Sequence, residues 1–371
     1  MTRTELVGRR DRTLFAAAAI LATCSPLLAQ PASLANARFQ RKNAAAGLEK
    51  AFREAAAAQP GPAWIAWPVP AVGRPHMCCY RSTDEISSSP CSGRCELENE
   101  MRNVSFVDSD DGDCWNRTGS TTMLVFLRVE RQEPERLRTF TLDCTIDAGG
   151  LPVVWLDDVK PAESVALLDS FVGKDSLSWK KRSKGSEPAL SAIAMHDDPA
   201  ADTVLERLST PSNPESVRKH VIFWLGNARG KRGYEVLANL ARRDESDAIR
   251  KSVTFGLSQS KVPEAMDALL GMARHDPNAT VRGQALFWLA QKAGKKAAGA
   301  IQDAIRDDPE AEVRKKAVFA LTQMPDNEGV PLLIEVARTN RHPEVRKQAV
   351  FWLGQSKDPR ALDFIEEVLK K

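Results

Sequence analysis

An eleven-residue pattern of apolar and polar positions occurs five times in the C-terminal half of the chain, each copy starting 32 residues after the last. The last copy, residues 345–355, reads VRKQAVFWLGQ. In the first copy, Val217, Val221, Ile222 and Leu225 have the spacing of one helix face. The pattern predicts a helix in every copy, and the fixed period predicts a solenoid of stacked repeats.

A second apolar pattern follows each copy in phase and predicts a second helix. Its residues are Val236, Leu237 and Leu240; Ala268, Leu269 and Met272; Ala300, Ile301 and Ala304; Leu332, Leu333 and Val336; and Phe364, Ile365 and Val368. One degenerate pair precedes the first copy, with Ala189, Leu190 and Ile193 in its first helix and Val204, Leu205 and Leu208 in its second. We therefore expect a mainly α protein whose residues 186–371 form an α-solenoid of about six helix pairs.

This pattern resembles the HEAT repeat family, in the short bacterial form often called phycobilisome-lyase-like. The resemblance rests on the Val-Arg-x-x-Ala-Val…Leu-Gly helices, the second helices, and the Asp-Pro turns at Asp276-Pro277 and Asp308-Pro309. It covers about half of the chain and implies a scaffold that binds proteins, since this fold carries many functions. Enzymatic relatives attach pigments or remove damaged DNA bases, but none of their catalytic positions is matched here. We expect no catalytic residue, no metal and no cofactor.

The N-terminus has the features of an export signal over residues 1–29. Arg3, Arg9, Arg10 and Arg12 precede an apolar run from Leu14 to Ala22 that is too short to span a membrane. The alternative is the N-terminal helix of a cytosolic protein. We expect a periplasmic or secreted protein without a membrane span. A lipid anchor at Cys24 is a lesser variant, because Thr is a poor fit before the cysteine.

The residues between the signal and the repeats predict a second, β-rich domain. Strong helix formers at 35–58 predict a helical linker over residues 30–60. Alternating apolar residues at 139–146, and apolar runs at 63–67, 123–129 and 153–156, predict strands in a domain over residues 61–160. Residues 161–185 are expected to be a helical connector, with a hinge at 180–187.

Six of the seven cysteines lie in this β-rich segment: Cys78, Cys79, Cys91, Cys95, Cys114 and Cys144. An even number behind an export signal predicts up to three disulfides, with fifteen pairings open. Adjacent Cys78 and Cys79 are expected to bond to different partners. The alternative is a four-ligand zinc site with ligands drawn from His76, Cys78, Cys79, Cys91 and Cys95.

Charge is unevenly distributed along the chain. Residues 217–371 carry 27 Lys and Arg against 20 Asp and Glu, a net charge of +7, within a whole chain of +3. This positive field is too weak to predict nucleic-acid binding, but it could attract an acidic partner. We expect a protein partner and no nucleic acid.

The second position of each copy is always arginine: Arg218, Arg250, Arg282, Arg314 and Arg346. Ser212, Asp244, Asp276, Asp308 and Asn340 stand five residues before each copy and can accept hydrogen bonds from these side chains. We interpret the arginines as a structural ladder that locks adjacent repeats, rather than as a ligand site.

Aromatic residues occupy the seventh and eighth positions of the copies. They are Phe223, Trp224, Phe255, Phe287, Trp288, Phe319, Phe351 and Trp352. On an ideal helix the phenylalanines lie nearly opposite the buried face, where repeated aromatic rings would mark an interaction site. The alternative is that the rings pack between neighbouring first helices. These eight residues are our candidates for partner binding.

The sequence thus predicts an exported, non-catalytic scaffold that binds proteins through its solenoid. The alternative is an enzyme or metal site in the cysteine-rich domain, with the solenoid as a targeting arm. Nucleophile-elbow, Walker and Rossmann signatures are absent from the sequence.

Overall fold

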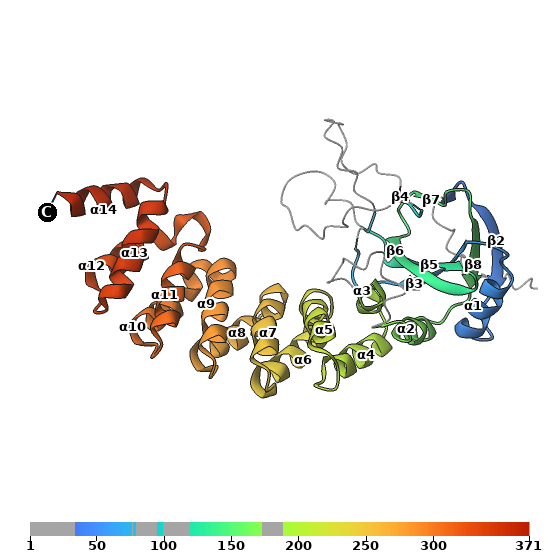
Figure 1. The fold of residues 1–371 in the computed structure, drawn as a ribbon, viewed down its shortest axis with the longest axis horizontal. Helices are drawn as coiled ribbons and strands as arrows, with labels where there is room; N and C mark the ends of the chain where they lie inside the picture. Colours follow the sequence, from blue (N-terminus) through green and yellow to red (C-terminus); the bar gives the residue numbers. More distant parts are fainter. Residues whose placement is uncertain (1–33, 76, 79–94, 99–118, 173–187, 371) are drawn as a thin grey trace, which may run out of the picture. The chain divides into compact units, whose positions relative to one another are not determined.

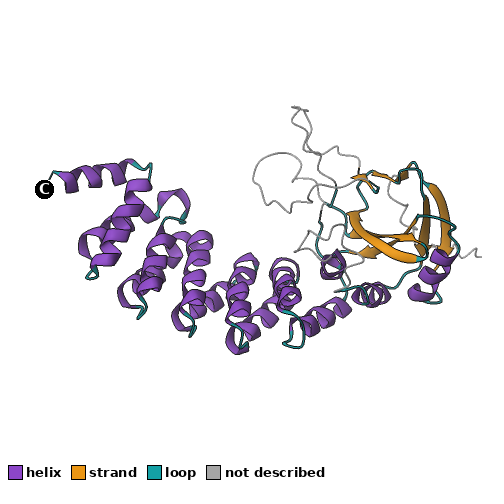
Figure 2. Cartoon of the chain, in the orientation of Figure 1, coloured by secondary structure: helices purple, strands orange, loops and turns teal. Residues whose placement is uncertain are grey.

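The computed structural model describes residues 34–75, 77–78, 95–98, 119–172 and 188–370. Figure 1 shows the order of the elements, and Figure 2 shows that the strands lie in one module and the remaining described chain is helical. The predicted export signal (1–29) and the predicted hinge at 180–187 lie outside the described residues.

The β module contains two sheets. The main sheet has the order β2-β8-β3-β5-β6, in which β2, β8 and β3 are parallel and β3, β5 and β6 are antiparallel neighbours. A smaller parallel sheet has the order β1-β7-β4. The strands are β1 (Leu34–Ala35), β2 (Arg38–Asn43), β3 (Ala63–Pro70), β4 (Cys95–Glu96), β5 (Thr122–Glu130), β6 (Glu133–Thr141), β7 (Ile146–Asp147) and β8 (Pro152–Asp157).

The central strands of the main sheet are buried on both faces. Ile65 and Trp67 of β3 belong to a core shared with helices α1 (Leu48–Ala57) and α2 (Pro161–Asp169). Trp64 of β3 belongs to a second core with Phe126 and Trp155. Strands covered on both faces are apolar at nearly every position, which is why the runs at 63–67, 123–129 and 153–156 could be recognised.

The helical linker predicted for residues 30–60 is wrong in its first half. Residues 38–43 form β2, which pairs in parallel with β8, and the helix begins only at Leu48. Helix propensity is a weak preference that the main-chain hydrogen bonds of a neighbouring strand can override. The remaining helix, α1, packs on the sheet through Leu48, Phe52 and Ala55 instead of serving as a linker.

The strand predicted at 139–146 ends earlier than expected. β6 stops at Thr141, and a turn closed by the Cys144 N–H donating to Thr141 O at 3.1 Å follows it. Phe140, Cys144 and Ile146 still reach the same core, as their alternation suggested. The period of two therefore identified the buried side chains but not the change of direction between them.

Six helix pairs follow the β module, which confirms the predicted solenoid. Their bounds are α3 (Pro188–Met195) and α4 (Pro199–Ser209); α5 (Glu215–Ala228) and α6 (Gly230–Arg243); α7 (Asp247–Gln259) and α8 (Glu264–His275); α9 (Ala279–Ala293) and α10 (Ala298–Asp307); α11 (Ala311–Leu321) and α12 (Gly329–Thr339); α13 (Pro343–Gln355) and α14 (Pro359–Leu369). Short 3-10 turns at Gly294–Ala297 and Pro325–Asn327 precede α10 and α12. First helices pack against first helices and second against second, so each repeat contacts its neighbours in two layers.

Candidate functional site

The eight aromatic residues form one continuous series of ring contacts, which we call the aromatic stripe. Phe223 stacks on Phe255 with ring centroids 6.0 Å apart, and Phe287 stacks on Phe319 at 6.1 Å. The indoles connect these pairs across the repeats. Phe255 lies 4.9 Å from Trp288, and Phe319 lies 5.0 Å from Trp352. Rings adjacent in sequence complete the series at 4.9–5.0 Å, in the pairs Phe223–Trp224, Phe287–Trp288 and Phe351–Trp352.

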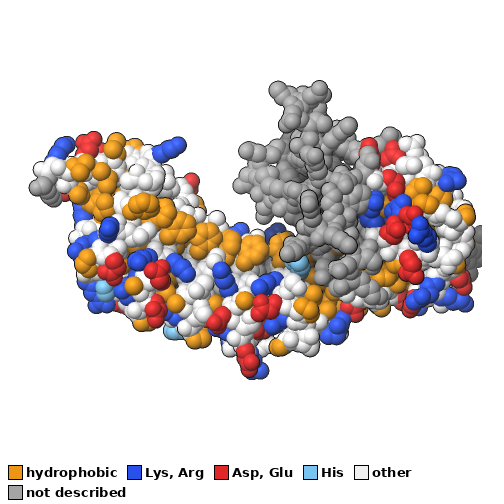
Figure 3. All heavy atoms as spheres, in the orientation of Figure 1, with side chains coloured by type: hydrophobic (Ala, Val, Ile, Leu, Met, Phe, Trp, Pro, Cys, Tyr) orange, Lys and Arg blue, Asp and Glu red, His pale blue; other side chains and the backbone are white. Residues whose placement is uncertain are grey.

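The aromatic stripe is packed and accessible at the same time. Phe223, Phe255, Phe287 and Phe319 are half-buried, while Phe351 is 54% exposed. Figure 3 shows hydrophobic side chains gathered in a stripe across the helix array, with basic side chains beside it. The phenylalanines of the first four copies therefore pack against a ring of a neighbouring repeat, as the packing interpretation predicts, and they remain partly accessible. Phe351 contacts only Trp352 of its own helix among the rings.

Large and small residues alternate at the position that follows each phenylalanine. Trp224, Trp288 and Trp352 alternate with Gly256 and Ala320. Gly256 allows close approach of α5 and α7: a Cβ added to Gly256 would lie 2.9 Å from Ile222 O, and one added to Gly226 of α5 would lie 2.0 Å from Gly256 O. Each small residue follows a phenylalanine that contacts the indole of the next repeat, as Phe255 contacts Trp288 and Phe319 contacts Trp352.

The arginine ladder joins consecutive repeats. Arg250 Nε donates to Asp276 Oδ2 at 2.8 Å, and Arg282 Nε donates to Asp308 Oδ2 at 2.8 Å. Arg218 contacts Asp244, and Arg314 Nη2 donates to Glu344 Oε1 at 3.1 Å. Asp244, Asp276 and Asp308 follow the second helix of the arginine's own repeat, at the turn into the next repeat, whereas Glu344 lies in the first helix of the next repeat. The hydrogen bonds to Asp276 and Asp308 raise the pKa values of Arg250 and Arg282.

Each ladder arginine also contacts the main chain before its own helix. The acceptors are Ser209 O for Arg218 (2.8 Å), Asp244 O for Arg250 (2.8 Å), Asp276 O for Arg282 (2.9 Å), Asp308 O for Arg314 (2.8 Å) and Asn340 O for Arg346 (2.7 Å). Carbonyls at the end of a helix have no partner within that helix, so these bonds satisfy them. The ladder arginines are therefore engaged in structural contacts. A binding surface on the first helices would have to use other side chains.

A buried polar chain joins the β module to the first helix pair. Trp67 Nε1 donates to Ser164 Oγ at 2.8 Å, and the same oxygen lies 2.8 Å from His196 Nε2. His196 Nδ1 lies 2.7 Å from Ala192 O, which can only accept, so Nδ1 carries the proton and Ser164 donates to Nε2. Burial lowers the pKa of His196 to about 4. The histidine is neutral and structural, a role that its place in the repeat pattern did not reveal.

The cysteines of the β module include one described disulfide, Cys78–Cys144, and Cys95 is also disulfide-bonded. Ligand atoms of Cys78, Asp143 and Cys144 lie within 4.8 Å of one another, but the two sulfurs are bonded together and cannot act as thiolate ligands. His76, Cys79, Cys91 and Cys114 lie outside the described residues.

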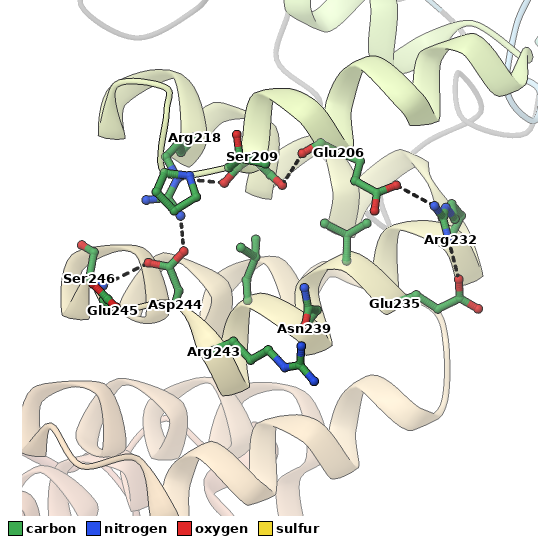
Figure 4. Close-up of a pocket in the computed structure, with 14 residues that line it drawn as sticks. Glu206, Ser209, Arg218, Arg232, Glu235, Asn239, Arg243, Asp244, Glu245 and Ser246 are labelled. Atoms are coloured by element: carbon green, nitrogen blue, oxygen red, sulfur yellow. Dashed lines mark hydrogen bonds and ion pairs between the residues drawn. The ribbon is translucent and has the colours of Figure 1, made fainter.

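A groove of about 830 Å³ lies between α4, α6 and the turn before α7. Figure 4 shows that several of its charged side chains pair with one another, while Arg243 has no drawn contact. Arg232 Nη2 donates to Glu206 at 2.6 Å and Nη1 to Glu235 at 3.3 Å, while Arg218 contacts Asp244. These internal pairs neutralise most of the charged side chains that line the groove.

The helix pairs are HEAT repeats: residues 201–290 and 300–371 match the family model for HEAT repeats. No curated protein sequence matches the chain. Among the described helices, none combines the length and the apolar character needed to cross a membrane.

Three solved structures align with part of the chain at low overall similarity. Escherichia coli YibA is 24% identical, with a TM-score of 0.33 over 52% of this chain and 72% of its own. Human deoxyhypusine hydroxylase is 16% identical, with a TM-score of 0.29 over 57% and 80%. The CpcE–CpcF complex of phycocyanin lyase from Nostoc is 18% identical, with a TM-score of 0.29 over 42% and 97%.

Proposed function

We propose that the helix pairs form a non-catalytic scaffold that binds another protein through the aromatic stripe. The observation that supports this most is the unbroken series of eight rings, which stays partly exposed over five repeats and ends in Phe351 at 54% exposure. Contiguous apolar surface of this kind marks interaction sites. Stacked repeats also provide the extended surface that such proteins use for binding.

The test compares two exposed apolar residues of the same terminal helix pair. Phe351→Asp places a charge in the aromatic stripe, whereas Leu369→Asp places the same charge on α14, where Leu369 is 80% exposed and outside the stripe. Both variants should unfold at nearly the wild-type temperature, because exposed positions contribute little to packing. The proteins are immobilised and exposed to an extract of the source organism, and bound proteins are quantified by mass spectrometry.

We expect Phe351→Asp to lose the proteins that the wild type and Leu369→Asp both retain. A bound set that is the same for all three proteins would overturn the proposal. A loss of thermal stability confined to Phe351→Asp would show instead that this ring belongs to the core.

We also propose that the protein is exported to the periplasm or secreted. The support is the basic and apolar character of residues 1–29 together with the Cys78–Cys144 disulfide, a bond that persists in oxidising compartments. Intact mass of the protein from its native host, alkylated with and without reduction, tests this. Export predicts loss of the N-terminal segment and alkylation only after reduction; a full-length chain with reactive thiols would contradict it.

A further inference from the structure

We propose that the aromatic stripe recognises an extended acidic segment of its partner, with apolar side chains about every third residue. This inference rests on the proposed function and makes it specific, because it names the chemistry of the segment that the five repeats would bind. It comes from the residues on either side of the phenylalanines.

Three parallel columns run along the exposed side of the first helices. A lysine stands four residues before the phenylalanine in four of the five copies, as Lys219, Lys251, Lys315 and Lys347. An amide side chain stands four residues after it in all five, as Asn227, Gln259, Gln291, Gln323 and Gln355. Residues four apart are neighbours on a helix surface, so the phenylalanines lie between a cationic column and an amide column.

The copy without this lysine, residues 281–291, has one supplied by the next repeat. Gly283 occupies the position, and a Cβ added there would lie 2.5 Å from Cδ of Lys316. The alkyl stem of Lys316 therefore passes over the space that a side chain at 283 would occupy. The glycine leaves room for a cation from α11, and the series of lysines continues across all five repeats.

The charged residues within the eleven-residue copies have one sign. The five eleven-residue copies contain five arginines, five lysines and no Asp or Glu. Carboxylates or carbonyls already bind the arginines, and Lys219 and Lys315 pair with Glu215 and Glu312 of their own helices. Lys251, Lys316 and Lys347 have no ion-pair partner within the described residues. Unpaired lysines beside exposed aromatic rings are complementary to a partner that carries both carboxylates and apolar groups.

The amide column fits a main chain rather than a folded surface. Asn227, Gln291 and Gln355 are exposed, and an amide side chain offers both a donor and an acceptor, which matches the peptide unit. Packed helices lie about 8–10 Å apart. A polyproline II segment advances about 9 Å in three residues and then presents the same face. An extended segment could therefore place one apolar side chain against each phenylalanine and one carboxylate towards each lysine.

Fluorescence anisotropy with three labelled peptides tests the proposal on the full-length protein. Each peptide has about fifteen residues, three for each repeat. The first repeats Asp-Phe-Pro, the second Lys-Phe-Pro, and the third Asp-Ala-Pro. We expect the first peptide to bind at least about tenfold more tightly than either of the others, and to weaken as NaCl rises from about 0.05 M to about 0.5 M.

Charge reversal in the lysine column provides the matched variants. Lys251→Glu with Lys347→Glu should remove most of the preference for the first peptide over the second. Lys231→Glu with Lys296→Glu changes the net charge equally on exposed lysines outside the first helices, and should leave the preference unchanged. Gln291→Ala with Gln355→Ala should lower the affinity for the first peptide several-fold. The salt dependence of binding should not change, because amides carry no charge.

The outcomes separate this inference from the proposed function. Equal binding of the Phe and Ala peptides, or equal effects of the two charge-reversal variants, would overturn the acidic-segment proposal. If none of the peptides binds while Phe351→Asp still loses captured proteins, the partner is a folded surface, and only this inference fails. If Phe351→Asp loses nothing either, the proposed function fails as well.

Discussion

Arg250 and Asp276 form a buried ion pair that joins α7 to the end of α8, with their side chains only 8% and 2% exposed. The guanidinium group also donates to Asp244 O, at the end of the second helix that precedes its own first helix. One side chain thus connects three helices, and the same arrangement recurs at Arg282 with Asp308 and Asp276 O. The repeats are coupled electrostatically as well as by packing.

Asp276→Ala should destabilise the protein by up to about 3–5 kcal/mol, because it removes the buried carboxylate that pairs with Arg250 and leaves only the exposed carboxylate of Asp247. Urea denaturation measures the free energy of unfolding. Asp303→Ala is the control, since Asp303 pairs with Arg306 on the surface and such pairs contribute less than about 1 kcal/mol. Equal losses in the two variants would show that the ladder has no special structural role.

Gly226 and Gly354 occupy the same position in different repeats, and their replacement by alanine should have opposite effects on the stability of the protein. A Cβ at Gly226 would lie 2.0 Å from Gly256 O, whereas nothing lies within 4 Å of one at Gly354. We expect Gly226→Ala to cost about 1–3 kcal/mol through overpacking. Gly354→Ala should stabilise by up to about 1 kcal/mol through helix propensity. Thermal unfolding of both variants tests the close approach of α5 and α7.

Phe255→Ala should cost more stability than Phe351→Ala, although both residues belong to the aromatic stripe. Phe255 contacts rings on both sides, Phe223 at 6.0 Å and Trp288 at 4.9 Å, whereas Phe351 contacts Trp352 alone among the rings. We expect a loss of about 2–4 kcal/mol for Phe255 and under about 1 kcal/mol for Phe351. Similar losses would mean that exposure along the stripe does not separate binding from packing.

Stability should decline on acidification because of His196. Its pKa is about 4 in the folded protein and about 6.5 in an unfolded chain. Between these values the unfolded state binds a proton that the folded state does not. The stabilisation is therefore complete above about pH 6.5 and falls by about 2–3 kcal/mol as the pH is lowered towards 4.

Denaturation at a series of pH values measures this dependence. His196→Gln should flatten the curve over this range, while His275→Gln, a change at an exposed histidine, should leave its slope unchanged. An unaltered slope in His196→Gln would assign the dependence to other groups. Asp198 opposes the shift in the pKa of His196 and Arg229 reinforces it, so burial remains its main cause.

The sequence alone predicted the six helix pairs, from the period of 32 residues and the apolar positions Val217, Val221, Ile222 and Leu225. Each repeat buries its apolar face only by stacking on its neighbours, so every copy must contain the same apolar positions. The arginines and the carboxylates of Asp244, Asp276 and Asp308 could likewise be paired from their spacing alone. The sequence did not identify β2, because its pairing with β8 depends on residues more than a hundred positions away.

Only the tertiary structure decided how the aromatic rings lie. A helical wheel placed Phe255 and Phe287 opposite the buried face of a single helix, yet each packs against a ring of the following repeat. The role of Gly283 is also visible only in the tertiary structure, where the side chain of Lys316 occupies the space beside this glycine. Local periodicity determines which face of a helix is apolar, whereas contacts between repeats depend on how closely neighbouring backbones approach.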